Sequence, residues 1–481
     1  MRHEPIALGP GGGPARASAE HRPARQGELD LLRALVVVVG LVLFHTAVIF
    51  AAGEFPLKAA AENRVVTVFI AFGATWGMPL LFVISGMGIW YSLRSRGAGA
   101  FARERLRRLL VPLVVGLLTL VPLQVYLGLR RSGKAGSLAD FYARFLDARP
   151  SLDFPFVLKA APDGGLFETG HLWFLVCLLA FSLVLLPAFA WLRGSTGIRL
   201  VERLGGLLAR PGAIFLPALP PAAVEVLMGS QVGQAAWNRY SYALFLVYGY
   251  LAAADTRIGE ALQRQWRPAM AFGVLLFVAA GPVFALAEAH GDPFTGTDPV
   301  SMAFRLLKGI DGWLWVVAIL GLARSRMARR PKTADRRPAA GGNEGARVVR
   351  RLGAYANDAV LPFYVLHETV IVVVAYQVLT WKIPAGAQFL LISLTSLVAT
   401  VLLYDLGVRR TRVTRFLFGL KPLAPATRSG PEVQVRPLRS GGDQLDGFRR
   451  LRRAAADQVG RLLRDHDRRG VGIAAGDDRH H

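Results

Sequence analysis

The chain has 481 residues, of which 53% are hydrophobic and only 19% are charged. A soluble protein of this length would carry more charge, so this composition and the mean hydropathy of +0.37 indicate a polytopic membrane protein. The single cysteine, Cys177, excludes an intrachain disulfide framework and a cysteine-based zinc site, and its apolar surroundings suit a small hydrophobic residue.

Apolar stretches long enough to cross a bilayer recur along most of the chain. Before the first of them lies a leader, 1–28, rich in Gly, Pro and Arg, which we expect to be disordered and cytoplasmic. The leader is not a signal peptide, because the apolar run that follows is too long and lacks a small-residue cleavage site. With about 20 residues needed per span, we predict an all-α protein with about ten transmembrane helices, at 29–52, 65–90, 109–129, 171–192, 211–228, 240–254, 268–287, 310–323, 359–380 and 387–407.

The segments outside these spans differ in composition. Residues 130–170 contain aromatic and acidic side chains and are numerous enough to form surface helices and to cap a site. Within the transmembrane domain, 29–407, the basic loop 324–358 contains Pro and Gly and is expected to be a flexible linker. The tail, 408–481, is basic and expected to be mostly disordered, although Leu445–Arg464 can form a helix that lies on the membrane surface.

Positive charge is concentrated on one side of the predicted topology. Of the 57 Lys and Arg residues, 45 fall in segments on the same side as the two termini and 12 on the opposite side. Lys and Arg accumulate on cytoplasmic loops, so we expect both termini in the cytoplasm and a multi-pass protein in contact with membrane lipid. This distribution accounts for the net charge of +24 without a nucleic-acid partner. The Ala-, Arg- and Gly-rich composition points to a bacterial inner or plasma membrane.

Three of the nine histidines fall at predicted helices, namely His45, His171 and His367. At about 1.5 Å per residue, His45 lies roughly 20 Å beyond Leu29, where an ionisable group usually faces a polar cavity inside the bundle. Neutral imidazole suits general base catalysis; the alternative is a histidine that only hydrogen-bonds a neighbouring helix. A metal site needs three converging ligands, and the sequence has no HxxxH or HxxE spacing, so we expect no metal.

Two arginines lie three residues apart at the expected cytoplasmic end of a span. Residues at this spacing share a helix face, so Arg105 and Arg108 can point in the same direction. Guanidinium groups bind phosphate oxygens with two hydrogen bonds, so the pair suits a phosphate-rich ligand. The alternative is the ordinary accumulation of positive charge at a cytoplasmic helix end.

Small residues interrupt the second predicted span. Gly86 and Gly88 favour close helix packing, and Pro79 predicts a kink. A catalytic role for Ser85 is not expected, because the GxSxG elbow of serine hydrolases is missing, and we interpret this serine as a packing or hydrogen-bonding residue.

Five stretches, in this order, resemble the acyltransferase type 3 family of integral-membrane acyltransferases, nearest the branch of the glucans-biosynthesis succinyltransferases. The stretches are LDLLRALVVVVGLVLFH (29–45), MPLLFVISGMGIW (78–90), RERLRRLLVPL (103–113), HLWFLVCLL (171–179) and NDAVLPFYVLHETVIV (357–372). The resemblance covers the chain from about residue 26 to 420. It implies an enzyme that moves an acyl group from cytoplasmic acyl-CoA to an acceptor, often a sugar hydroxyl, on the outer side of the membrane.

The resemblance also assigns individual residues. His45 matches the essential histidine, Arg33 the basic residue before it, Arg105 and Arg108 the paired arginines, and Tyr364 and His367 the Tyr-x-x-His stretch. The family usually has ten residues between the basic residue and the histidine, and this chain has eleven. One extra residue turns Arg33 by about 100° from the usual face, unless a local bulge absorbs it. Glu368 stands where many relatives carry an uncharged residue.

We therefore expect an O-acyltransferase that uses acetyl-CoA or succinyl-CoA as co-substrate. Arg105 and Arg108, with Arg33, would hold the acyl-CoA. His45 would take the proton of the acceptor hydroxyl or carry the acyl group, and His367 would be the second catalytic residue. The residues expected to face the extracytoplasmic glycan acceptor are His171, Trp173, Tyr364 and Glu368.

Other interpretations remain for the same residues. His171 and Trp173 are also typical of an aromatic anchor at the membrane interface. A transporter or flippase for a glycan or lipid would move its substrate without consuming a thioester, although the chain lacks the inverted repeat of many transporters. A catalytically inactive membrane scaffold is a third class. The free-energy cost of placing His45 and His367 within the membrane argues against it.

Overall fold

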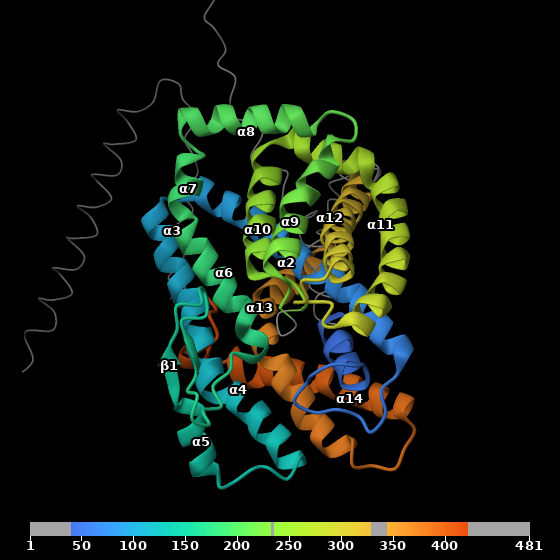
Figure 1. Cartoon of the computed structure of the whole chain (residues 1–481). Coiled ribbons are helices and arrows are strands. Elements are labelled where there is room, and N and C mark those ends of the chain that lie inside the picture. The colour runs from blue at the N-terminus through green and yellow to red at the C-terminus, as the bar shows by residue number, and fades with distance from the viewer. Residues whose placement is uncertain (1–39, 232–234, 329–343, 422–481) are drawn as a thin grey trace, which may run out of the picture. The chain divides into compact units, whose positions relative to one another are not determined.

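The computed structural model describes residues 40–231, 235–328 and 344–421, and these residues are mostly helical, as predicted (Figure 1). The α-helices after Gly40–Phe50 are α2 Arg64–Ser95, α3 Ala98–Arg105, α4 Val111–Arg131, α5 Leu138–Leu146, α6 Trp173–Val184, α7 Leu186–Trp191, α8 Ser195–Leu208, α9 Leu219–Met228, α10 Arg239–Ala254, α11 Thr256–His290, α12 Pro299–Ala328, α13 Glu344–Val378, α14 Ala385–Leu402 and α15 Arg412–Leu417. The expected leader 1–28, the surface helix 445–464 and the middle of the expected linker 324–358 lie outside the described residues.

Six helices in the described part of the chain are long and apolar enough to cross a membrane, and each overlaps one predicted span. They are Arg64–Ser95, Ala98–Arg131, Thr256–His290, Pro299–Ala328, Asp358–Val378 and Ala385–Val408. A seventh results if Ser195–Leu208 and Ala213–Met228, which meet at 112°, form one span. These helices indicate a multi-pass membrane protein.

The remaining predicted spans are represented by shorter helices. Gly40–Phe50 is the described part of the first, and Gly170–Val184 covers most of the fourth. The sixth corresponds to α10, which has 16 residues. Both the total of about ten spans and the cytoplasmic location of the termini stay predictions.

The backbones of α2 and α10 touch through two glycines. A Cβ atom added to Gly86 would lie 2.0 Å from the Leu246 carbonyl oxygen, and one added to Gly249 would lie 1.9 Å from the Val83 oxygen. The predicted close packing at Gly86 is therefore confirmed. No described atom lies within 4 Å of a Cβ built on Gly88, and α2 continues as one helix through Pro79.

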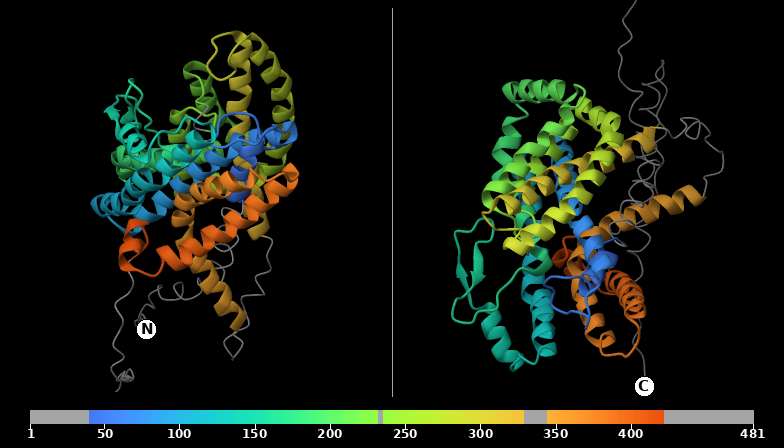
Figure 2. Two further views of the ribbon diagram at one scale, coloured as in Figure 1. Left: turned by 90° about the horizontal axis from the view of Figure 1, so that it is seen from below. Right: turned by 45° about the vertical axis from the view of Figure 1, so that its right-hand side comes forward.

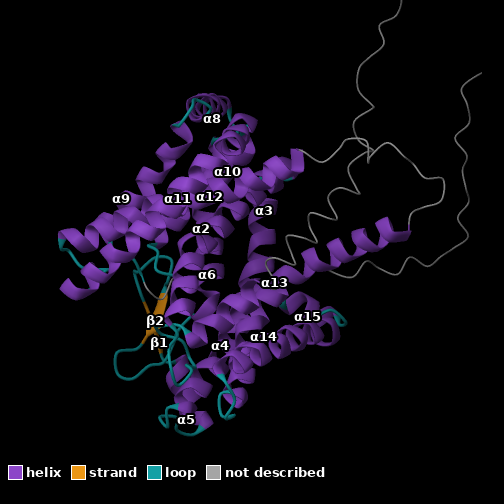
Figure 3. Cartoon of the chain, turned by 90° about the vertical axis from the view of Figure 1, so that its right-hand side faces the viewer, coloured by secondary structure: helices purple, strands orange, loops and turns teal. Residues whose placement is uncertain are grey.

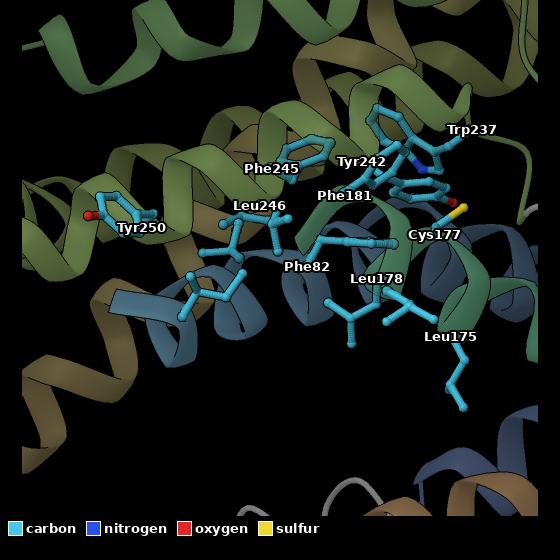
Figure 4. Packing of buried hydrophobic residues seen from close by; sticks show 14 of the residues in the cluster. Phe82, Leu175, Cys177, Leu178, Phe181, Trp237, Tyr242, Phe245, Leu246 and Tyr250 are labelled. Carbon is cyan, nitrogen blue, oxygen red and sulfur yellow. The ribbon is translucent and has the colours of Figure 1, made fainter. Parts of the chain in front are cut away.

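Aromatic side chains fill the space beside this contact. The ring of Phe82 stacks on that of Tyr242 at 4.7 Å and meets Phe174 edge-on at 4.9 Å. Figure 4 shows Phe82 and Tyr242 between the helices, with Cys177 at the edge of the same cluster. Cys177 is buried as a free thiol, in agreement with its expected role as a small hydrophobic residue.

The helix α12 starts at Pro299, eleven residues before the predicted start at 310, and packs beside α11 (Figures 1 and 2). Lys308, which was expected in a loop, lies within α12 and is buried. Its Nζ donates to Glu225 Oε2 at 2.9 Å and to Ser230 Oγ at 2.8 Å. Hydropathy did not predict this part of the helix because a buried ion pair lowers the apolar average.

The segment between α4 and α6 forms α5 and a short hairpin, as the length of residues 130–170 allows. Strand β1 (Ala148–Pro150) pairs antiparallel with β2 (Leu158–Ala160), with Ala148 opposite Ala160 (Figure 3). Asp153 in the hairpin turn accepts from Arg239 Nη1 at 2.5 Å, so an ion pair fastens this segment to the start of α10.

Candidate active site

Three histidines from distant parts of the sequence meet inside the bundle. His45 comes from the helix Gly40–Phe50, His171 from the 3₁₀ turn Gly170–Leu172 before α6, and His367 from α13. The ring centroids of His45 and His367 are 4.8 Å apart, and those of His171 and His367 are 5.4 Å apart. The sequence identified each histidine separately, but only the packing of the three segments shows that they form one cluster.

Glu368 joins the histidines through both oxygens of its carboxyl group. Its Oε2 lies 3.4 Å from His45 Nε2, and its Oε1 lies 3.7 Å from His171 Nδ1. Glu368 therefore stands between two of the three imidazoles.

Each imidazole is oriented by a hydrogen bond to a backbone carbonyl. The contacts are His45 Nδ1 to Leu41 O at 2.9 Å, His171 Nε2 to Val365 O at 3.2 Å and His367 Nδ1 to Tyr364 O at 2.7 Å. A carbonyl only accepts, so the bonded ring nitrogen carries hydrogen and the second nitrogen of a neutral ring has a lone pair. The lone pairs of His45 and His171 thus face Glu368.

A glutamine from α4 completes the cluster. In the amide orientation that satisfies Glu368 and Thr369, the Gln124 nitrogen donates to Glu368 Oε1 at 3.3 Å and its oxygen accepts from the Thr369 hydroxyl at 2.6 Å. Sequence reasoning missed Gln124. The available signal was a polar amide within an apolar stretch, which is costly unless the amide has partners.

The cluster is reached at His45. The His45 side chain is 20% exposed, whereas those of His171 and Glu368 are 3% and 7% exposed. His45 is therefore the more exposed member of the cluster, and the two other side chains lie deeper in the protein.

Two of the predicted acceptor-binding residues, Tyr364 and Trp173, lie beside the cluster. The Tyr364 hydroxyl donates to the backbone carbonyl of His171, and the Trp173 ring packs 5.3 Å from that of Tyr242. Tyr364 thereby holds the turn that presents His171. Contact of either residue with an acceptor stays a prediction.

The two predicted phosphate-binding arginines lie at the other end of the helix that carries Gln124. Arg105 is the last residue of α3, and Arg108 belongs to the π-helix Leu106–Leu110 that leads into α4. The Arg105 guanidinium lies over the Phe101 ring at 5.0 Å, and Arg108 Nη1 lies 3.6 Å from Glu104 Oε1.

The helix α4, which connects the arginine pair to the histidine cluster, shows how far apart they lie. From Arg108 to Gln124 the chain advances by roughly 24 Å, at about 1.5 Å per residue, so the arginines and the histidine cluster are set well apart along the bundle. Arg33, the third predicted arginine, lies outside the described residues.

Comparison with curated proteins and with solved structures finds no match. A family model described as an acyltransferase domain matches residues 26–405. The matched range is most of the chain and includes the three histidines, Glu368, Gln124 and both arginines. The resemblance of the five sequence stretches is therefore confirmed at the level of the family. The chain belongs to the acyltransferase type 3 family of membrane acyltransferases.

Proposed function

We propose that the protein is an O-acyltransferase that moves an acetyl or succinyl group from cytoplasmic acyl-CoA to a hydroxyl of an extracytoplasmic carbohydrate. The observation that carries this proposal is the contact between His45 Nε2 and Glu368 Oε2 at 3.4 Å, on the exposed side of the cluster. We place the termini and the Arg105/Arg108 end of α4 in the cytoplasm of a bacterium, following the charge distribution.

The donor end of the reaction is assigned to the arginine pair. Arg105 and Arg108 would bind the phosphates of acyl-CoA, because guanidinium groups make charge-assisted hydrogen bonds to phosphate oxygens. The pantetheine arm would then extend along α4 toward Gln124 and bring the thioester to His45. Acyl transfer across the membrane would thus need no movement of the acceptor into the cytoplasm.

The chemical step is assigned to His45 and Glu368. His45 Nε2 takes the proton of the acceptor hydroxyl while the hydroxyl oxygen attacks the thioester carbonyl. The carbon–sulfur bond breaks, the ester forms, and the departing thiolate of CoA receives the proton from His45. Glu368 stabilises the imidazolium that forms on His45, and the Gln124 amide holds Glu368 in place by donating to Oε1.

Base catalysis by one such group typically contributes 10²–10⁴-fold, so positioning of the two substrates must supply the remaining acceleration. His367 packs edge-on against the His45 ring and would keep that ring aimed at the acceptor. Trp173 and Tyr364 would line the acceptor side, beneath the segment 130–170.

Thiol release from acetyl-CoA and succinyl-CoA tests the proposal, with purified detergent-solubilised protein, the His45→Ala variant and a matched His290→Ala variant. His290 is an exposed residue at the end of α11, away from the cluster. We expect thiol release by the wild type and by His290→Ala, and loss of release in His45→Ala. Equal release by His45→Ala would refute the assigned base. No release together with no binding of CoA would favour a transporter or flippase.

A further inference from the structure

We propose that His45, His367 and Glu368 form a binding site for a divalent transition-metal ion, best matched by Zn²⁺, and that occupation of this site blocks acyl transfer. The binding site stands on the geometry of the three residues alone. Its inhibitory effect rests on the proposed function, because it assumes that His45 is the base.

The donor atoms of the three residues are already close to the spacing that zinc requires. One ligand atom from each residue lies within 4.8 Å of the other two. A tetrahedral zinc site with bonds of about 2.0–2.1 Å has ligand atoms about 3.4 Å apart, and the distance from His45 Nε2 to Glu368 Oε2 is 3.4 Å. Two imidazoles and one carboxylate are a donor set that zinc uses in enzymes.

The imidazoles are held in the form that a metal needs. The Nδ1 atoms of His45 and His367 each bond a backbone carbonyl, Leu41 O and Tyr364 O. This leaves both Nε2 lone pairs free to coordinate, and such an outer hydrogen bond is typical of histidines that bind metals. The remaining oxygen of Glu368, Oε1, accepts from the Gln124 amide nitrogen at 3.3 Å.

His367 supplies an independent observation that a ligand belongs here. Its side chain is fully buried, and its Nε2 has no hydrogen-bond partner among the described residues. A buried polar atom without a partner is unfavourable, because it has lost its hydrogen bonds to water and gained none in the protein. A metal ion bound to this nitrogen would remove that cost, and the exposed edge of His45 gives the ion a route to it.

The sequence offered no reason to expect this site, since no HxxxH or HxxE spacing is present. Such spacings place two ligands on one helix. Here His45 comes from the helix Gly40–Phe50, and His367 and Glu368 are adjacent residues of α13. A search for ligands three or four residues apart therefore does not find them.

Metal binding and catalysis would compete for one pair of electrons. A zinc ion on His45 Nε2 occupies the lone pair that takes the acceptor proton in the proposed reaction. The bound ion would therefore act as an inhibitor, released by a chelator.

The test uses the full-length protein purified through a tag without histidine. Zinc bound after equilibration is measured by elemental analysis, for the wild type and for the His367→Ala, Glu368→Gln and His290→Ala variants. We expect the wild type and His290→Ala to bind one zinc ion per chain more than His367→Ala and Glu368→Gln. Equal zinc content in wild type and His367→Ala would overturn the site.

A second measurement does not depend on the folding of variants. Co²⁺ bound to the wild-type protein at this site should give the intense visible absorption of a tetrahedral complex, which Zn²⁺ then displaces. A weak spectrum typical of octahedral cobalt in water would contradict the site. Neither metal measurement requires acyl transfer, so failure of the site and failure of the proposed function are distinguishable.

The inhibitory effect is tested by titrating Zn²⁺ into the thiol-release assay. We expect inhibition of the wild type and of His290→Ala at the same Zn²⁺ concentration, with reversal by a chelator; a wild-type rate that Zn²⁺ leaves unchanged would overturn the inhibitory role. Activity that falls when the chelator is added would overturn the inhibitory role, because zinc would then be required for the reaction.

Discussion

Glu368 bridges two histidines, with Oε2 3.4 Å from His45 Nε2 and Oε1 3.7 Å from His171 Nδ1. Replacement of Glu368 by Gln keeps the shape of the side chain but removes the charge that would stabilise protonated His45. We therefore expect kcat for thiol release to fall by about 10²-fold or more, within the range of proton-transfer catalysis. Kinetics with the better acyl-CoA donor measures the effect.

The matched control for Glu368 is Glu288→Gln, since Glu288 is an exposed acid near the end of α11. This control should keep the wild-type rate. A Glu368→Gln variant with wild-type kcat would show that the carboxylate charge has no part in the reaction.

Substitution of Arg105 or Arg108 should affect the binding of acyl-CoA more than the chemical step. Arg105→Ala and Arg108→Ala should each raise KM for acyl-CoA by about 10-fold or more, because a hydrogen bond to a charged group contributes about 1.5–3 kcal/mol. The kcat should change less, since phosphate contacts are made in both the ground state and the transition state. Arg103→Ala is the control, because Arg103 is exposed on the same helix. An equal increase in KM for all three variants would argue for a general effect of surface charge.

The contact between α2 and α10 predicts different effects of alanine substitution at two neighbouring glycines, Gly86 and Gly88. Gly86→Ala would place a methyl group 2.0 Å from the Leu246 oxygen, whereas Gly88→Ala meets no described atom within 4 Å. We expect Gly86→Ala to lower the thermal midpoint and the yield of monodisperse protein in detergent, because overpacking a tight contact typically costs 1–3 kcal/mol or more. Gly88→Ala should behave like the wild type, and similar losses for the two variants would contradict the assigned contact.

The buried ion pair between Glu225 and Lys308 predicts a large loss of stability when one partner is removed. Glu225 also accepts from the Ser241 hydroxyl at 2.6 Å and from the Asn238 backbone N–H at 2.8 Å. Lys308→Met would leave the buried carboxylate without its countercharge, at a cost of about 3–5 kcal/mol. Thermal unfolding in detergent measures this.

The double variant Glu225→Gln/Lys308→Met tests whether charge causes the loss. It should recover part of the thermal midpoint, because the uncompensated charge is gone. Lys382→Met, at an exposed position after α13, should have no effect. A single Lys308→Met variant as stable as the wild type would show that the pair contributes nothing.

Asp255, between α10 and α11, predicts how stability depends on pH. Hydrogen bonds from Arg257, with Nη2 2.6 Å from Oδ2, outweigh burial and hold the pKa of the Asp255 carboxyl below its usual value. A depressed pKa means that the ionised carboxylate stabilises the fold. This contribution is complete above the pKa of the unfolded chain, about 3.9, and is lost as the pH falls through the lower pKa of the folded protein.

The measurement compares thermal midpoints of the wild type and Asp255→Asn across pH. At neutral pH the variant should be less stable by about 1 kcal/mol, since Arg257 is partly exposed, and the difference should shrink below about pH 4. Glu260→Gln, which removes an exposed pair with Arg264 at 3.9 Å, should show no difference. A gap that persists unchanged in acid would refute the role of the Asp255 charge.

The sequence predicted those features of the fold that depend on the residues of a single helix and not on its partners. The length of an apolar run was enough for six helices that can cross the membrane. A glycine alone did not decide a close contact, since Gly86 contacts α10 whereas Gly88 has no described atom within 4 Å of a built Cβ. The start of α12 was not predicted, because Lys308 is neutralised by Glu225 from another helix. A hydropathy average cannot include a partner that is distant in the sequence.

The candidate site was likewise predicted as individual residues and not as a cluster. His45, His171 and His367 were identified because ionisable groups are rare in membrane helices. Their convergence, and the position of Gln124 beside Glu368, depend on how four segments pack, and no local pattern contains that information.

A last consequence follows from the single helix α4, which links the arginine end to the histidine cluster. A helix barely stretches, so α4 and the π-helix Leu106–Leu110 before it fix a separation of roughly 24 Å between Arg108 and Gln124. Under the proposed function, donors would be selected by the length of the arm between phosphate and thioester rather than by the acyl group. Thioesters with a shortened arm would then fail to occupy both ends at once, whatever acyl group they carry.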